Sequence, residues 1–497
     1  MEMVHTNLKE IDNQGMPESP TIIISKISLL KKRLESFSNG ENLRILHIGN
    51  IANNAYLAAR SERNIGIESY VLSSDYTHIM GAPEWEHCEV ARPQDKHFDS
   101  GFSDCSCSFQ RPEWFHDGSL VSAVSSIMRD LSPNEQDESI QKVEVSKKFK
   151  ASLKNLSSKI VSLIWKLLRP IGKKLIPVRF RAGVIGNLYH ALRKKTQIDL
   201  SQVFDNFDII NMYGSSPYLI SHITMKKTSR RKFVTTEHGT LRDYIFAKYP
   251  LSQDTKIGYE KSNAVFVTNQ DCLPVALNLR IPIVIKMPHP VNDDLLDNYR
   301  SIREINIRKT QKIILVPSRH SLSLDIDRGK GNENVYEVIK NFPRNFADVK
   351  FVLIAWGDNV AGAKNLLKRE EEDGLVEWID VLSRPLLKQL MTRSICILDQ
   401  FKIEAYGAVT VDGIGLGVPV ITSHSCENDS NYFGSCAPVF SAITPTDILA
   451  HITQIVKFDP LENLEHFEYS TKWYDNNLSE FISLESRLRG YLETLQS

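Results

Sequence analysis

Short apolar runs alternate with helix-like stretches along most of this chain, and this alternation narrowly limits how it can fold. The segments "LRILHIGN" at 43–50 and "IESYVLSS" at 67–74 have the composition of buried strands. The stretch between them has helical spacing and ends at Gly66. A strand, a helix and a second strand within about 30 residues form a βαβ unit, whose two strands lie parallel in one sheet. The sequence therefore predicts an α/β fold.

The same alternation occurs in two series. The first series is interrupted from about 76 to 200 and resumes with apolar runs at 207–214, 232–239 and 263–270. The second begins near residue 312 and contains "KIILVPS", "KFVLIAWG", "VEWIDV", "SICILDQF" and "VPVITS". A chain of 497 residues is also too long for one ordinary core. We therefore expect two Rossmann-like, doubly wound domains, spanning 1–290 and 291–474.

The interruption contains a basic insert, at about 110–200. The whole chain has 60 basic and 60 acidic residues, but 147–195 has fourteen Lys or Arg and no Asp or Glu. Apolar residues recur there at helical spacing beside Trp165, a pattern typical of helices that lie on anionic membranes. Two alternatives stay open, namely a helix packed on its own domain and a nucleic-acid patch. No nucleic-acid module accompanies the charge, so we expect no nucleic-acid partner.

The cysteines and the N-terminal segment indicate in which cellular compartment the protein is expected. The seven cysteines are scattered and form no CxxC pair, which favours a reduced, cytoplasmic chain without a zinc site. The N-terminus is polar and lacks the apolar core of a signal peptide. No uncharged apolar run approaches the roughly 20 residues that span a bilayer. Together with the basic insert, this predicts a cytoplasmic protein, peripheral on the inner face of the cytoplasmic membrane.

Two basic residues of the second series stand where an α/β domain binds anions. Ligands of such domains lie at the carboxyl ends of the strands, where helix N-termini offer free N–H groups. Arg319 follows the apolar run "ILVPS", and Lys330 precedes Gly331 at the start of a helical stretch. A guanidinium and an ammonium there could hold a pyrophosphate. The alternative is that both are solvated loop charges.

The segment "EAYGAVTVDGIGLGVPVIT" at 404–422 combines glycines with carboxylates. It has four glycines, each of which costs about 1 kcal/mol relative to alanine inside a helix. Glu404 stands before the helix, where it could bind sugar hydroxyls, and Gly407 would let a ligand approach the backbone. Asp412 could bind a ribose, as acidic residues do in dinucleotide folds. The alternative is a buried helix packed closely on the sheet, with Asp412 merely exposed.

Glu404 and Asp412, eight positions apart and followed by "GLGVPVI", resemble the Glu-x7-Glu signature of family-4-like (group 1) retaining glycosyltransferases of bacterial type. The resemblance includes "LVPSRH", "KGNENVYEVIK" and "LDQF", and it covers both α/β domains but not the insert. The segments "GNIANNAYLAA" and "DYTHIMGAPEWE" look like acceptor-domain loops, and "EHGTLRD" resembles the His-Gly-x-x-Arg loop of the family. Asp412 departs from the pattern, which usually has glutamate.

The resemblance implies the GT-B fold, in which two Rossmann-like domains face each other across a cleft. It also implies a C-terminal helix at 475–497 that packs back on the first domain. The residues that it implies as catalytic are His238, Arg319, Lys330 and Glu404. Those implied to bind the nucleotide sugar are Gly49, Asn50, Asn53, Asn54, Arg242, Gly407 and Asp412. Those implied on the acceptor side are Asp75, His78 and Glu237.

The implied activity is transfer of a hexose from a nucleotide-sugar donor to a glycan or lipid-linked acceptor, with retained configuration, in cell-surface polysaccharide assembly. No Asp-x-Asp motif directly follows a predicted strand, so we expect no metal and no cofactor besides the co-substrate. Two alternatives stay open. One is a non-catalytic GT-B scaffold docked on the membrane, and the other is a nucleotide-sugar epimerase.

Overall fold

The computed structural model describes residues 20–37, 42–74, 78–94, 107–118, 120–131, 200–221, 231–307, 312–321 and 329–497. The chain forms two compact units. The N-terminal unit comprises Ser38–Glu84, Asp99–Ile285 and Glu493–Ser497. The C-terminal unit comprises Met1–Phe37, Trp85–Phe98 and Lys286–Leu492. Residues 20–37 and 85–94, which the sequence analysis included in the first domain, therefore belong to the C-terminal unit.

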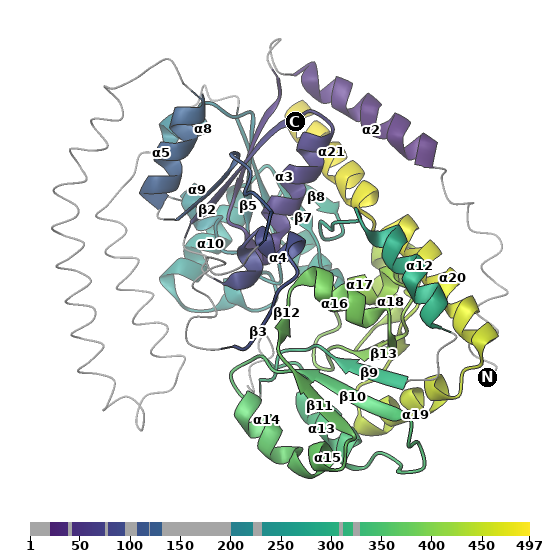
Figure 1. Cartoon of the computed structure of the whole chain (residues 1–497). Coiled ribbons are helices and arrows are strands. Elements are labelled where there is room, and N and C mark those ends of the chain that lie inside the picture. The colour runs from purple at the N-terminus through teal and green to yellow at the C-terminus, as the bar shows by residue number, and fades with distance from the viewer. Residues whose placement is uncertain are drawn as a thin grey trace, which may run out of the picture. The chain divides into compact units, whose positions relative to one another are not determined.

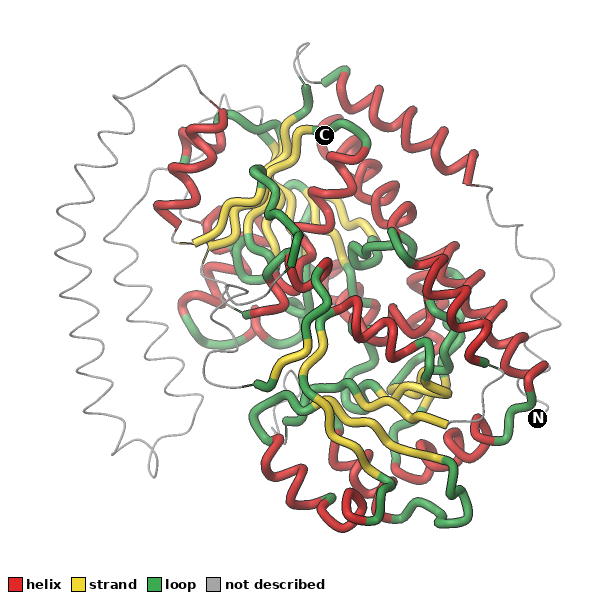
Figure 2. The backbone as a smooth tube through the Cα atoms, in the orientation of Figure 1, coloured by secondary structure: helices red, strands yellow, loops and turns green. Residues whose placement is uncertain are grey.

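The N-terminal unit is built on a seven-stranded sheet. In spatial order its strands are β4 (Phe115–Gly118), β2 (Glu68–Ser74), β1 (Arg44–Ile48), β5 (Ile209–Tyr213), β6 (Lys232–Thr236), β7 (Ala264–Val267) and β8 (Ile283–Lys286). The pairs from β4 to β7 are parallel. Figure 1 labels several of these strands, and Figure 2 shows the same sheet as adjacent yellow tubes.

Helices cover both faces of this sheet. They are α3 (Asn54–Asn64), α5 (Leu120–Leu131), α8 (Ser201–Phe204), α9 (Tyr218–Ser221), α10 (Pro250–Lys261) and α11 (Leu273–Asn278), with 3-10 turns at Ile51–Asn53, Ile79–Gly81, Tyr244–Phe246 and Gln270–Cys272. Apolar side chains of α5 and α8, such as Ile127 and Phe204, are fully buried against strand residues including Ile210 and Phe233. Burial of this apolar area is the main force that holds each layer to the sheet.

The C-terminal unit contains a six-stranded sheet in which all pairs are parallel. In spatial order the strands are β11 (Val376–Ile379), β10 (Val349–Ile354), β9 (Lys312–Val316), β13 (Ser394–Leu398), β14 (Val420–Thr422) and β15 (Phe440–Ser441). A separate two-stranded antiparallel ladder joins β12 (Val381–Leu382) to β3 (Ala91–Arg92). This ladder is why the segment around β3 belongs to the C-terminal unit.

The helices of the C-terminal unit are more numerous. They are α2 (Pro20–Glu35), α4 (Glu84–His87), α12 (Leu296–Asn306), α13 (Asn332–Lys340), α14 (Val360–Leu366), α15 (Lys368–Glu372), α16 (Arg384–Met391), α17 (Ala408–Gly415), α18 (Cys426–Phe433), α19 (Pro445–Val456), α20 (Pro460–Asn477) and α21 (Glu480–Gln496). The last residues of α21, from Glu493, group with the N-terminal unit. The core of the C-terminal unit joins β9, β10 and β13 to α13 and α19, with Val335, Phe351 and Ile452 all buried.

The two sheets share one topology. Numbered along the chain, their first six strands stand in the order 3-2-1-4-5-6, which is that of Rossmann-like domains. The prediction of two doubly wound α/β domains is therefore confirmed. In this topology ligands bind outside the carboxyl ends of the two strands where the order reverses. Those strands are β1 and β5 in the N-terminal unit, and β9 and β13 in the C-terminal unit.

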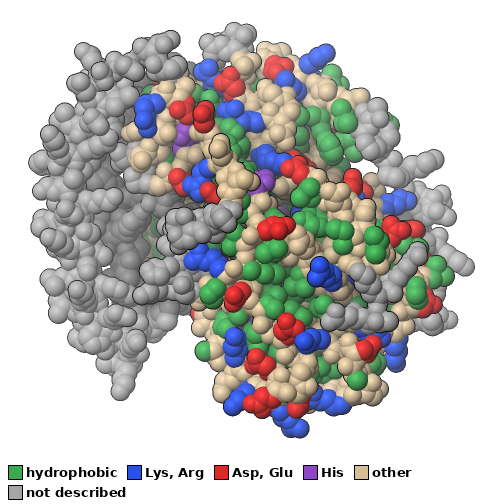
Figure 3. All heavy atoms as spheres, viewed as in Figure 1, with side chains coloured by type: hydrophobic (Ala, Val, Ile, Leu, Met, Phe, Trp, Pro, Cys, Tyr) green, Lys and Arg blue, Asp and Glu red, His purple; other side chains and the backbone are tan. Residues whose placement is uncertain are grey.

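The predictions about the basic insert and the membrane depend in part on residues that the structure does not describe. The basic insert at 147–195 lies outside them, so its predicted membrane contact stays a prediction. No helix among the described residues combines the length and apolar character needed to cross a membrane. On the face drawn in Figure 3, the described basic and acidic side chains are interspersed.

Candidate functional site

The loops after β9 and β13 form the point where the strand order of the C-terminal sheet reverses. Arg319 stands two residues beyond the β9–Pro317 turn and is half-buried, and it makes no ion pair with any described residue. Asp399 and Gln400 directly follow β13 and are almost fully buried, at 4% and 3% exposed. A cation without a carboxylate partner at this position is available to an anionic ligand.

Lys330 is held next to the β13 loop by backbone geometry. The N–H of Phe401 donates a hydrogen bond to the carbonyl of Lys330 at 2.8 Å, and the Lys330 ammonium donates to the Gln400 side-chain oxygen. Gly331 adopts a φ of +74°, and a Cβ at this position would lie 2.8 Å from that of Phe401. Only glycine fits this crossing without strain. The glycine therefore places Lys330 beside Gln400 and begins α13.

The N-terminus of α17 opens into the same region. Gly407 is the N-cap residue and its helix has no side-chain cap, so the first N–H groups have no partner within the helix. The hydroxyl of Thr410, in the first turn, donates to Asp399 at 2.7 Å. A Cβ on Gly407 would lie 3.3 Å from the same carboxylate. The helix start is thus tied to the end of β13, where its dipole favours negative charge.

Gln400 links these parts, and sequence reasoning gave it no role. Its side-chain oxygen accepts from Lys330 and its amide nitrogen donates to the carbonyl of Ala405. Glu404, next to Ala405, is exposed, and its carboxylate accepts one hydrogen bond from Asn428 at 3.3 Å. The signal for Gln400 was its place directly after a buried strand. Three residues predicted to be catalytic therefore stand on loops at one edge of the C-terminal sheet, namely Arg319, Lys330 and Glu404.

Asp412 needs a correction. Its carboxylate, 4% exposed, lies 2.7 Å from one Arg384 nitrogen and 3.7 Å from the Lys388 ammonium. It also accepts a hydrogen bond from Arg384 at 2.8 Å. Although burial opposes a charge on Arg384, the carboxylates of Asp412 and Glu86 raise the pKa of its guanidinium. Asp412 is not merely exposed, because two cations of α16 pair with its carboxylate. This pairing competes with the predicted ribose contact, which stays a prediction.

In the N-terminal unit, the side chains of the asparagines after β1 make hydrogen bonds within the protein. The Asn50 amide nitrogen donates to Asn53 at 2.9 Å and to the carbonyl of Gly81 at 2.8 Å, and its oxygen accepts from the N–H of Tyr56. The Asn53 amide donates to the carbonyl of Ala82. Both side chains are 0% exposed. Their predicted contact with a nucleotide sugar is therefore replaced by a structural task, which is to hold the turn at 79–82 against the start of α3.

Glu237 is also withdrawn from the ligand-binding set. It is 0% exposed, and its carboxylate accepts from the N–H groups of Gly239, Thr268 and Asn269, from the Thr268 hydroxyl and from the Asn269 amide. Four of these five bonds join the end of β6 to the end of β7, and the fifth, from Gly239, lies within the loop after β6. A buried carboxylate that already accepts five hydrogen bonds cannot contact an acceptor. The acceptor-side prediction is therefore wrong for Glu237.

The other predicted residues of this unit occupy loops at the same edge of the sheet. Arg242 forms a two-pronged ion pair with Asp271. Burial lowers the pKa of Arg242, but the Asp271 carboxylate outweighs that effect and the pKa is raised. The ring of His238 is half-buried, with Nδ1 at 3.3 Å from the Asn54 amide nitrogen. Gly49 follows β1 with a φ of +86°.

Two acceptor-side predictions remain. The ring of His78 accepts a hydrogen bond from the N–H of Met80 and caps the turn at 79–81. Asp75 lies outside the described residues. No finding tests the role predicted for His78 or Asp75, so both stay predictions.

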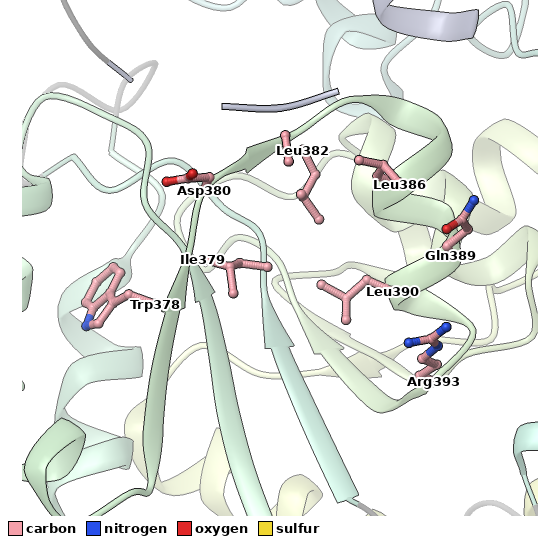
Figure 4. Close-up of a pocket in the computed structure, with 9 residues that line it drawn as sticks. Trp378, Ile379, Asp380, Leu382, Leu386, Gln389, Leu390 and Arg393 are labelled. Carbon is pink, nitrogen blue, oxygen red and sulfur yellow. The ribbon is translucent and has the colours of Figure 1, made fainter. Parts of the chain in front are cut away.

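A groove of about 520 Å³ in the C-terminal unit contains none of the predicted residues. Figure 4 shows Leu386 and Leu390 of α16 pointing toward Ile379 and Leu382 of the neighbouring strands. Asp380, Gln389 and Arg393 add polar groups to its lining. The groove is lined by residues of β3, β11, β12 and α16 and by Asp380 and Arg393, and most of the lining residues are apolar.

The cysteines differ from the expectation of a fully reduced chain. Cys426 and Cys436 are joined by a disulfide across ten positions of sequence. Cys272 and Cys396 are free and buried. The expectation of a reduced chain is therefore wrong for the first pair.

Comparisons with known proteins bear on the fold. No protein-family model matches the sequence, and no curated protein is similar to it by sequence. The trehalose-6-phosphate phosphatase N-terminal domain of Candida albicans has a TM-score of 0.53 and 9% identity, covering 92% of this chain and 99% of that one. HepE from Anabaena, solved with UDP and glucose, has a TM-score of 0.52 and 11% identity, covering 92% of this chain and 100% of that one.

HepE solved with UDP-glucose has a TM-score of 0.52 and 10% identity, covering 91% of this chain and 100% of HepE. These likenesses concern the fold alone. The fold is GT-B, with two Rossmann-like domains, as the sequence resemblance implies.

Proposed function

We propose that this protein is a glycosyltransferase that moves a sugar from a nucleotide-sugar donor to a glycan or lipid-linked acceptor. The observation that supports the proposal is that Arg319, Lys330 and Glu404 stand on the loops after β9 and β13, where the strand order of the C-terminal sheet reverses. The GT-B fold supports it, because a protein of the same fold, HepE, was solved with UDP-glucose. The finer assignments, namely a family-4-like retaining hexosyltransferase of polysaccharide assembly, rest on the sequence resemblance.

The donor diphosphate would lie between the two cations and the start of α17. Arg319 offers a forked guanidinium without a carboxylate partner among the described residues, and Lys330 offers an ammonium fixed by its hydrogen bond to Gln400. The uncapped N–H groups after Gly407 add partial positive charge. These groups belong to three separate segments. Gln400 links two of them, because it bonds both Lys330 and the carbonyl of Ala405.

The same groups explain how transfer would be catalysed. When the anomeric C–O bond breaks, negative charge grows on the leaving nucleoside diphosphate. Cations that are already in place stabilise this charge without reorganising during the reaction. Glu404, whose carboxylate is exposed, would accept hydrogen bonds from sugar hydroxyls and orient the anomeric carbon. The account needs no metal in catalysis, and it assigns no carboxylate nucleophile.

Asp412 has a positioning role in this proposal. The ion pair with Arg384 fixes α17 against α16, and α17 presents Gly407 to the donor. The ribose ligand that the resemblance implies at this position is not part of the proposal. His238 is proposed as the contribution of the N-terminal unit to the reaction, on the strength of the His-Gly-x-x-Arg resemblance.

The acceptor and location are proposed from the insert. The basic segment at 147–195 suits the anionic inner face of the cytoplasmic membrane, where lipid-linked acceptors are held. Co-sedimentation with vesicles tests this proposal. Binding should require anionic lipid and should disappear when 147–195 is deleted, and equal binding to neutral vesicles would contradict it.

The enzymatic proposal is tested by screening nucleotide sugars for transfer and for donor hydrolysis. Lys330→Ala and Glu404→Gln should each lower turnover by about 100-fold or more, as loss of one preorganised group does. Lys402→Ala is the matched control for the lysine, because Lys402 is exposed and pairs with Glu333 at 2.6 Å. Glu427→Gln, at an exposed position of α18, is the control for the glutamate.

Three outcomes would overturn or redirect the proposal. Unchanged turnover in Lys330→Ala and Glu404→Gln would refute their assignment. Donor binding without any turnover would favour the scaffold. Release of an epimerised sugar in place of a glycosidic product would favour the epimerase.

A further inference from the structure

Four side chains that commonly bind transition metals meet around α18. Cys426 begins the helix, Asp429 lies in its first turns, His424 precedes it and Cys436 follows its end. His424, Asp429 and Cys436 present ligand atoms that all lie within 4.8 Å of one another. Cys426 joins this set through its disulfide with Cys436.

The spacing of these atoms is close to that of a zinc site. His424 Nε2 lies 3.1 Å from Asp429 Oδ2 and 3.5 Å from Cys436 Sγ. A tetrahedral zinc ion with bonds of about 2.0–2.3 Å holds its ligand atoms about 3.3–3.8 Å apart. These two pairs would therefore need shifts of only a few tenths of an ångström, whereas the two sulfurs would have to move apart after the disulfide is reduced. The Cys426 sulfur, already adjacent to that of Cys436, would be the fourth ligand.

Two of these side chains are shielded from water. The side chains of His424 and Asp429 are each only 3% exposed. The distances to Asp429 and Cys436 involve His424 Nε2, so zinc would bind at Nε2. The other ring nitrogen, Nδ1, is buried without a hydrogen-bond partner among the described residues and would carry the proton of the neutral ring.

We propose that, when the Cys426–Cys436 disulfide is reduced, the chain binds one Zn²⁺ through Cys426, Cys436, His424 and Asp429. Thiolate and imidazole ligands favour zinc over magnesium or calcium. Disulfides are rare in the cytoplasm, the compartment that the sequence predicts, so the thiol form is the relevant one there. Reduction by a phosphine breaks the S–S bond, adds two electrons and two protons, and converts the phosphine to its oxide with oxygen from water. Zinc then displaces both thiol protons.

The zinc ion would be structural. Tyr406 donates its hydroxyl to Asp429 at 2.5 Å, and Asn428 of α18 donates to Glu404. Zinc at the start of α18 would therefore stabilise the segment that carries Glu404 without contacting a sugar. Any effect on donor affinity rests on the proposed function, whereas zinc binding itself does not.

The test uses the full chain, reduced with a water-soluble phosphine and freed of metal by dialysis. Zn²⁺ alone is titrated in competition with a chromophoric chelator, and Co²⁺ is titrated separately for its visible absorption. The reduced wild type should bind one equivalent of zinc at this site, and its cobalt form should show thiolate-to-metal charge transfer. Cys436→Ser and His424→Gln should each weaken zinc affinity by about 100-fold or more, since even the loss of an outer-shell partner costs 10–100-fold. Cys272→Ala and His116→Gln, both in the N-terminal unit, are matched controls that should keep wild-type affinity.

Any of three results would overturn the proposal. The first is that the reduced wild type fails to bind zinc in the titration. The others are that Cys436→Ser and His424→Gln, or the disulfide-bonded form, bind zinc with the same affinity as the reduced wild type. If a variant fails to fold, as judged by circular dichroism, the cobalt spectrum of the wild type still shows whether the cysteines bind the metal. A cobalt spectrum without a thiolate band excludes the cysteines as ligands. Loss of sugar transfer with intact zinc binding would count against the proposed function alone.

Discussion

Replacement of Asp412 by asparagine should destabilise the C-terminal unit by an amount characteristic of a broken buried ion pair. The Asp412 side chain is 4% exposed and that of Arg384 is 11% exposed, with 2.7 Å between the closest charged atoms. At an effective dielectric constant of about 20, two unit charges at this separation attract each other by roughly 6 kcal/mol before desolvation is counted. Removing one partner of such a pair typically costs about 3–5 kcal/mol, because the other charge stays buried.

The surroundings place the expected loss at the lower end of that range. Arg384 keeps a second carboxylate, that of Glu86, 3.7 Å away. Lys388 keeps its hydrogen bond to the carbonyl of Asn292 at 3.1 Å. We therefore expect Asp412→Asn to lower the free energy of unfolding by about 3 kcal/mol. An Arg384→Met, Asp412→Leu double variant should recover most of this loss, because apolar replacement removes both buried charges.

Amide hydrogen exchange of peptides that cover α16 and α17 is the suitable assay, since a two-domain chain does not unfold in a single transition. Asp297→Asn is the matched control, because the Asp297 side chain is 99% exposed and lies 3.8 Å from Arg300. It should change stability by less than about 0.5 kcal/mol. A loss in Asp412→Asn no larger than that of the control, combined with weaker donor binding, would refute the reasoning and restore Asp412 as a ribose ligand.

Three further predictions follow from individual contacts. Gly331→Ala should destabilise this part of the chain by about 1–3 kcal/mol, because its φ of +74° disfavours any side chain and a Cβ would meet Phe401. Hydrogen exchange of peptides that cover 329–340 measures the loss, and unchanged exchange would contradict the close approach to Phe401. Burial lowers the pKa of His320 from 6.5 to about 4, so its neutral form stabilises the fold above pH 6.5 and the benefit is lost as pH falls toward 4. The hydrogen-exchange protection of peptides that cover 312–321, corrected for the pH dependence of intrinsic exchange, should decline over that window and decline less in His320→Gln. Identical pH profiles would contradict the assignment. Glu237→Gln should cost at least about 1.5–3 kcal/mol in the same assay, as it loses hydrogen bonds to a charged acceptor, and a neutral effect would show that the five bonds are dispensable.

The sequence predicted the sheets well because their strands are buried and parallel. Such strands form nearly continuous apolar runs, and each run ends in the polar or glycine residues of a loop. The strand β4 was missed because Phe115–Gly118 has only two buried residues and lies at the edge of the sheet. The edge strand β8, Ile283–Lys286, is only partly buried, so its apolar pattern is too short to stand out.

The candidate site was predicted only in part, for a different physical reason. Sequence spacing located Arg319, Lys330 and Glu404 because each stands beside a strand end or helix start that can be recognised locally. It cannot show which polar side chains are already satisfied by distant residues. Glu237 and Asp412 have suitable chemistry, yet their partners lie on β7 and α16, and this pairing depends on tertiary packing.

The most direct test of the central claim is to map where a nucleotide sugar protects the backbone from hydrogen exchange. The full chain is incubated with each candidate donor, and protection is measured for peptides that cover 318–321, 329–334 and 399–410. The account predicts protection of all three segments by a binding donor, and its loss in Arg319→Ala and Lys330→Ala but not in Lys402→Ala. Protection confined to other segments, such as the groove lined by Leu386 and Leu390, or no protection by any donor, would contradict it.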